Sequence, residues 1–264
     1  MSTNPLLDKI RRIPGEMCRL PSHGLHYPEG MFADNVTNGD VEVFPVSAYD
    51  EILLKSTELL ISGEGIFYLF ERKIPSILKP RELYHKDVDF LLAVLRKVSR
   101  GDELVVPYTH KCEEAKNHNY TIPISQFIKA TKRIDPTQFN NTFTLPCGSV
   151  VELAGARFVD VLEITQLTLR LSGKESLSAK DIEDATVNAI SRTIKSVDGV
   201  TDPIFIQEWL VEIPSTYRTK IREQLDKLSA CWGTDFKYTT KCKDCGEEID
   251  LSPMLNPVSF FMLP

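Results

Sequence analysis

Two cysteines near the C-terminus have the residue type and spacing that are most specific for chemistry in this chain. Cys242 and Cys245 stand in the run Lys-Cys-Lys-Asp-Cys-Gly, between two short strand-like segments. A Cys-x-x-Cys turn followed by glycine is the knuckle that supplies two ligands to zinc in treble-clef and ribbon sites, and a structural zinc ion takes four. The two remaining ligands are therefore expected from another part of the chain.

A second group of metal-binding residue types lies far upstream, in another loop between strand-like segments. This loop holds His110, Cys112 and His118, and both loops follow the same order of glycine, acidic residue, strand, lysine and cysteine. Zinc ribbons are built from two such hairpins, each of which brings one knuckle to the metal. We therefore expect the ligands of a structural zinc ion to be Cys112, His118, Cys242 and Cys245, with His110 as the alternative if His118 points away. Such a closed site contributes to folding and leaves no position for a substrate.

Three other interpretations of the late knuckle stay open. The upstream loop could have lost its metal role, which would leave Cys242 and Cys245 as a bare turn. The pair could be a redox dithiol, although the motif follows a strand, and it is the N-terminus of a helix that lowers a thiol pKa. A zinc ribbon could also bind nucleic acid, but acids largely offset the lysines of the knuckle. These charged residues are Lys241, Lys243, Asp244, Glu247, Glu248 and Asp250.

The composition favours a protein-binding protein over an enzyme or a nucleic-acid binder. The chain of 264 residues has 31 basic and 37 acidic residues, and its formal charge of −6 argues against a general phosphate-binding surface. No apolar run has the length of a membrane span, and the first residues lack the order of a signal peptide, so we expect a cytoplasmic protein without disulfides. The sequence has no phosphate-binding glycine loop, nucleophile elbow or other catalytic set, and no enzymatic activity is expected. The less favoured alternative is an enzyme, either thiol-redox through Cys242 and Cys245 or metal-dependent through an open zinc site.

Hydrophobic periodicity predicts an α+β fold with a mostly helical body and short β-hairpins. The clearest helix covers residues 87–100, because acids occupy its first turn, bases occupy its last turn and Gly101 follows as a C-cap. Alternating apolar residues between turn residues indicate the strands. The predicted helices are residues 49–61, 87–100, 157–171, 178–197, a segment from Pro203, and 216–230; the predicted strands are residues 41–46, 104–108, 120–124, 142–145, 150–153, 236–239 and 248–251.

Four regions follow from this pattern. Residues 1–45 are expected to form an irregular N-terminal arm and an edge strand, and residues 46–156 an α+β region with the first knuckle. Residues 157–232 are helical, and residues 233–264 hold the second knuckle and an apolar tail. The last region is expected to form one compact unit with residues 46–156, in which the knuckles make a zinc-ribbon-like clasp. Termini are usually polar, so this tail is expected either to pack into the protein's own core or to dock on a partner.

The order of several segments resembles the baseplate hub proteins of T-even-like contractile-tailed bacteriophages. An arm of the form Leu-Pro-Ser-x-Gly-x-x-Tyr-Pro precedes a helix of the form Asp-x-Asp-Phe-Leu-Leu and a cysteine knuckle. The resemblance covers most of residues 18–153 and the C-terminal knuckle, and it is weaker across residues 157–230. Where a first knuckle with two cysteines is expected, this chain has Cys112 and His118, and histidine commonly replaces cysteine at zinc sites. The resembling segments are residues 20–28, 46–51, 88–96, 242–245 and 259–261.

The resemblance implies a structural or assembly role. Members of the family are described as baseplate hub subunits or hub assembly factors, which act in the host cytoplasm while the centre of the baseplate is built. It implies other phage baseplate or hub proteins as partners, and neither nucleic acid nor a membrane. It implies no catalytic residues, and it is compatible with a homo-oligomer and with a final place in the virion tail. The arm, the tail and exposed helical faces are the expected contact surfaces.

Overall fold

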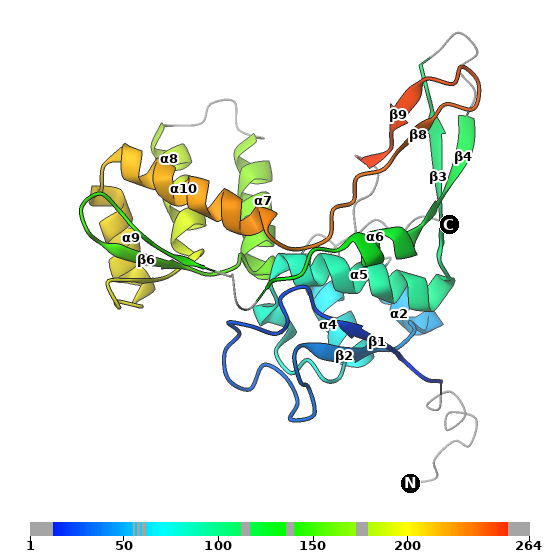
Figure 1. Cartoon of the computed structure of the whole chain (residues 1–264), viewed down its shortest axis with the longest axis horizontal. Coiled ribbons are helices and arrows are strands. Elements are labelled where there is room, and N and C mark those ends of the chain that lie inside the picture. Colours follow the sequence, from blue (N-terminus) through cyan, green and yellow to red (C-terminus); the bar gives the residue numbers. More distant parts are fainter. Residues whose placement is uncertain are drawn as a thin grey trace.

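The chain forms an α+β fold in which helices alternate with small antiparallel sheets, as the sequence pattern predicts. The computed structural model describes residues 13–54, 56, 59, 62–111, 117–135, 140–172 and 179–252. Within these residues each sheet has two or three strands. The molecule is elongated, with a helical lobe at one end and β-hairpins projecting at the other (Figure 1). No described helix is long and apolar enough to cross a membrane.

A central helix organises the first core. This helix, α5 (His85–Arg100), is the one that the sequence predicts most clearly, and it ends where Gly101 adopts a φ of 88° and donates its N–H to the Lys97 carbonyl. Phe90, Leu91, Leu92 and Val94 are fully buried on it. The same core includes side chains of α4 (Glu64–Lys73), of β2 (Asp40–Val43) and of the segments that flank the short 3-10 helix η1 (Pro80–Glu82). Helix α2 (Ala48–Leu54) contacts α4.

The N-terminal arm is more ordered than its sequence pattern indicates. Strand β1 (Glu16–Arg19) pairs antiparallel with β2, so that Glu16 lies opposite Val43. Only four residues alternate there, which is too few to stand out in the sequence. The chain then turns irregularly through left-handed residues such as Gly24, which has a φ of 71°. The backbone of Gly39 packs so close to Gly24 that a Cβ on Gly39 would lie 2.7 Å from the Gly24 nitrogen. The arm is therefore packed onto the first core.

A second lobe forms around a three-stranded sheet. Strands β5 (Thr142–Thr144) and β6 (Val150–Leu153) are the predicted hairpin, and β7 (Ile194–Val197) pairs with the other edge of β6. The apolar side chains of this sheet share a core with three helices. These are α8 (Ala179–Ser191), α9 (Pro203–Glu212) and α10 (Ser215–Ala230).

The end of α8 differs from the prediction. The sequence pattern predicts a helix that continues to residue 197, but α8 ends at Ser191 and the chain continues into β7. The β-branched Ile194 and Val197 lie opposite residues of β6, where they are buried in the core of the lobe. Such residues pack well on a sheet, and this tertiary pairing outweighs the helical periodicity of the segment. The continuous-helix prediction is therefore wrong over its last residues.

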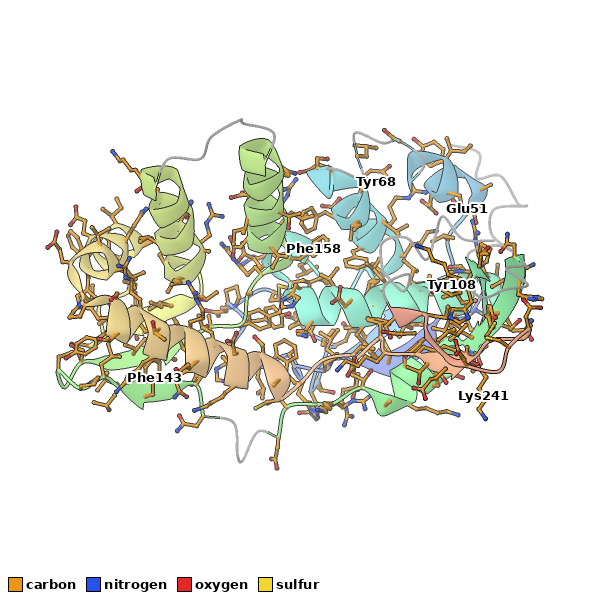
Figure 2. The ribbon with its side chains drawn as sticks, turned by 90° about the horizontal axis from the view of Figure 1, so that it is seen from above. Glu51, Tyr68, Tyr108, Phe143, Phe158 and Lys241 are labelled. Carbon is orange, nitrogen blue, oxygen red and sulfur yellow. The ribbon has the colours of Figure 1, made fainter. Side chains whose placement is uncertain are left out.

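Helix α7 (Phe158–Ser172) lies between the two lobes. The ring of Phe158 packs edge-on against the ring of Phe67 in the first core, with 5.8 Å between centroids, while α7 also contacts α8. Figure 2 shows Phe158 in the middle of the molecule, with Phe143 towards one end and Tyr108 towards the other. After α10 the chain reaches residue 132, in the segment that follows residues 124–130, where Gly233 and Lys132 exchange two backbone hydrogen bonds of 2.9 and 3.1 Å.

Two hairpins from distant parts of the sequence pack together at the far end. The first consists of β3 (Glu103–Thr109) and β4 (Asn117–Pro123), followed by α6 (Ile124–Ala130); the second consists of β8 (Thr239–Lys241) and β9 (Glu248–Asp250). They share one small core with α6, to which β3 and β4 contribute Leu104 and Ile122 and the second hairpin contributes Ile249. Strand β8 begins at Thr239, the last residue of the segment predicted for it.

Candidate metal centre

The loops of the two hairpins bring three metal-binding side chains together. One potential ligand atom from each of His110, Cys242 and Cys245 lies within 4.8 Å of the others. His110 follows β3 directly, and its Nδ1 is 3.4 Å from the Sγ of Cys245. Cys242 is buried in the shared core, whereas Cys245 is exposed at the tip of the second hairpin. The cluster thus joins residues that are 135 positions apart in sequence.

The knuckle has a backbone geometry that favours the thiolate form of Cys242. The Gly246 N–H donates to the Cys242 carbonyl at 3.0 Å, and the Cys242 N–H donates to the Glu247 carbonyl at 2.7 Å. Gly246 can close this tight turn because it adopts a φ of 77°, which is strained for other residues. The backbone N–H groups of Cys245 and Asp244 donate to the Cys242 sulfur and lower its pKa to about 6. Thiolates are the species that bind metals.

Polar contacts outside the thiols fasten the second hairpin to the first. The Lys243 N–H donates to the Tyr120 hydroxyl at 3.3 Å, and the Lys243 ammonium lies 5.0 Å from the centre of the Tyr120 ring. The same ammonium donates to the Asn119 carbonyl. The Nε2 of His118 lies 2.8 Å from a carboxylate oxygen of Asp244. The two central residues of the Cys-x-x-Cys turn therefore contact β4 directly.

The structure separates the two candidate histidines. His110, the alternative ligand in the sequence analysis, lies with the thiols, and His118 lies against Asp244. His118 belongs to β4, where it pairs in register with Tyr108, whereas His110 is the first residue after β3. The sequence contains no signal that would distinguish these positions, because both histidines flank the same loop. Cys112, the third predicted ligand of the first hairpin, lies outside the described residues.

The residues of this cluster fit a structural zinc site by their chemistry. Two thiols and one imidazole are ligands that zinc prefers, and a further thiol from Cys112 would complete a Cys3His set. A carboxylate oxygen of Glu247 stands 3.8 Å from the Nε2 of His110. Carboxylates in such positions commonly orient a metal-bound histidine. The ligand assignment itself stays a prediction.

A second polar cluster joins the N-terminal arm to the start of α5. The carboxylate of Asp87 is fully buried and accepts hydrogen bonds from the Ser22 N–H at 3.0 Å, from the Ser22 hydroxyl, and from the Tyr27 hydroxyl at 2.7 Å. Burial raises the pKa of Asp87 to about 6, while these donors act in the opposite direction. The Tyr27 ring also stacks on Tyr84 at 4.3 Å. These contacts join the arm to the start of α5, so the cluster acts as a structural junction.

Comparison with known proteins identifies the family to which the chain is similar. A protein-family model described as T4 bacteriophage base plate protein matches residues 44–262. The match includes α5, the second lobe and the second knuckle, and it begins after the N-terminal arm. Searches of curated proteins and of solved structures gave no match.

Proposed function

Because this chain belongs to the T4 bacteriophage base plate protein family, we propose that it is a component or assembly factor of the central hub of a phage baseplate. The observation that carries the proposal is the match over residues 44–262, which extends through both lobes and the paired hairpins. The family makes the chain a structural protein of the phage tail. The hub is the finer part of the proposal, and the resemblance of residues 20–28 and 88–96 to hub proteins supports it.

The proposed activity is assembly through contacts with other phage proteins and involves no catalysis. In this proposal the chain joins its partners in the host cytoplasm while the hub is built. The elongated shape supports this role, because a helical lobe and a pair of hairpins at opposite ends provide separate surfaces (Figure 1).

We further propose that a zinc ion holds the hairpins together through His110, Cys242, Cys245 and Cys112. The hairpins belong to segments far apart in sequence, and each has only two strands. Two-stranded hairpins are marginally stable alone, so a crosslink between them stabilises both. The bound ion would be held by four side-chain ligands, and the residues around it would set the orientation of the two loops.

Metal content of the purified protein tests the zinc site. We expect one zinc per chain by mass spectrometry of protein purified with a reducing agent, and loss of that zinc in Cys242→Ser, Cys245→Ser and Cys112→Ser. His110→Ala is expected to lose or weaken zinc binding, whereas His118→Ala retains it. Cys231→Ser is the matched control, since Cys231 is an exposed free cysteine outside the cluster. Zinc retained in His110→Ala but lost in His118→Ala would contradict the assignment of His110.

The hub role is tested by removing the chain from the phage that encodes it. Infection with a phage that lacks the gene is expected to leave baseplates without an assembled central hub, as seen by electron microscopy. The full-length chain supplied from a plasmid restores them. Normal hubs in the absence of the chain would contradict the hub proposal and would leave only the family membership.

A further inference from the structure

Helix α9 is rich in apolar residues but packs with only one face. The side chains on the outward face of a surface helix are normally polar. Ile206 and Leu210, one turn apart, are buried in the core of the second lobe. Three other apolar side chains point outward, because Ile204 is 65% exposed, Phe205 is 60% exposed and Val211 is 55% exposed.

The outward apolar side chains of α9 lie on either side of an acidic strip. Ile204 and Val211 are seven residues apart and lie on one side, whereas Phe205 lies about 100° further round the helix on the other side. Val200, in the turn that precedes the helix, is also exposed, at 45%. Both views place α9 at the end of the molecule opposite the hairpins (Figures 1 and 2). We refer to Val200, Ile204, Phe205 and Val211 as the α9 surface.

Acidic residues accompany the α9 surface. Glu208 lies between Ile204 and Val211 on the same helix face, and Glu212 follows one turn later. Neither forms an ion pair within the part of the chain that the structure describes. The sequence from residue 199 to residue 217 contains no lysine, arginine or histidine. The surface thus combines apolar with acidic side chains, and the adjoining sequence carries no basic residue.

We propose that the α9 surface docks another baseplate protein that presents an apolar groove carrying lysine or arginine opposite Glu208 and Glu212. The identity of this partner as a baseplate protein rests on the proposed function, whereas its chemistry follows from the charge of the surface. Complementary charges steer association and exclude wrong partners. A second copy of the chain would place acid against acid, and an anionic lipid surface would repel Glu208 and Glu212. A protein groove that combines apolar and basic residues is the occupant that matches both the apolar and the acidic residues.

Binding to purified baseplate proteins of the same phage tests this surface. Each protein is titrated separately with the full-length chain and with an Ile204→Asp/Phe205→Asp variant, by calorimetry. The partner is expected to bind the variant at least about 30-fold more weakly, as at other apolar anchor positions. Leu78→Asp is the matched control, because Leu78 is 57% exposed between α4 and η1, away from α9, and it should leave the affinity within about twofold. Circular dichroism melts confirm that both variants fold.

Charge reversal tests the acidic residues of the surface separately. A Glu208→Lys/Glu212→Lys variant is expected to bind about tenfold more weakly, and the affinity of the unmodified chain should fall as salt is raised. Changing the facing lysines of the partner to glutamate should restore binding to the reversed variant. An unchanged affinity after charge reversal would overturn the stated chemistry of the partner.

Other outcomes assign the surface to a different occupant. If the chain dimerises in sedimentation and Ile204→Asp/Phe205→Asp abolishes the dimer, the occupant is a second copy. If the chain binds phosphatidylcholine–phosphatidylglycerol vesicles and the same variant does not, the occupant is lipid. If a baseplate protein binds only after residues 253–264 are removed from the chain, the occupant is the chain's own tail. Each of these results overturns the proposal. If a baseplate protein binds the unmodified chain and the variant equally, the α9 proposal is overturned and the proposed function stands. If no baseplate protein binds the chain, both the α9 proposal and the proposed function are contradicted.

Discussion

Two junctions join distant parts of this chain, and they do so by different chemistry. At the first, Asp87 at the start of α5 accepts hydrogen bonds from Ser22 and Tyr27 of the N-terminal arm. At the second, the tips of the two hairpins bring His110 together with Cys242 and Cys245. Asp87 and Ser22 are fully buried at the first junction, whereas Cys245 at the second is exposed.

The difference shows which junction is complete within the protein. A buried carboxylate with three donors has its hydrogen-bonding capacity largely satisfied, so the arm needs nothing further to stay in place. Hydrogen bonds between two thiols and an imidazole stabilise the fold little, because sulfur is a weak hydrogen-bond partner. The same groups are strong ligands for zinc. The arm junction should therefore be insensitive to metal, and the hairpin junction should depend on it.

Substitution of Asp87 is expected to have the largest effect. Asp87→Ala leaves the Ser22 and Tyr27 donors buried without an acceptor, and it should lower the free energy of unfolding by about 3 kcal/mol. Urea titration measures this loss. The matched control is Asp202→Ala, because Asp202 is exposed and caps α9 by accepting from the Ile204 N–H at 2.8 Å. Loss of this cap should cost about 1 kcal/mol. Equal losses in the two variants would show that the arm junction is not a buried anchor.

Removal of metal is expected to have a smaller and local effect. A chelator should lower the opening free energy of the amides around Cys242 and Glu248 by about 2–3 kcal/mol, if zinc had been present at about 100 times its dissociation constant. Hydrogen exchange with and without chelator measures this change. The amides of Ser22 and Val88 serve as the internal control and should exchange at unchanged rates. Similar acceleration at both junctions would contradict the distinction between them.

Loss of the His118 contact is expected to have the smallest effect. His118→Ala removes one hydrogen bond to Asp244 and should destabilise the protein by about 1 kcal/mol. A double-mutant cycle with Asp244→Ala isolates the coupling between the two side chains. A coupling energy near zero, together with loss of zinc in His118→Ala, would place His118 among the metal ligands. The hairpin junction would then include His118 as well.

The elements that follow from local pattern could be predicted, and those that depend on pairing could not. Helix α5 has its charged end turns, its Gly101 C-cap and its apolar face in one stretch of sequence, so its bounds agree closely with the prediction. Strand β7 looks helical in isolation, and only the free edge of β6 makes it a strand. Strand β1 is similarly defined by β2. At the metal centre the two cysteines are recognisable by their spacing, but the choice between His110 and His118 depends on where β3 ends and β4 begins.

The sequence by itself determined the α+β class, the resemblance to a baseplate family and the residue types of a zinc knuckle, because these depend on periodicity and on spacing within short segments. The tertiary structure decided what each motif contacts. It buried the arm against Asp87, placed His110 beside the thiols and left one face of α9 exposed. The physical reason is that burial and convergence of side chains depend on packing between distant elements, and no single segment of sequence contains that information.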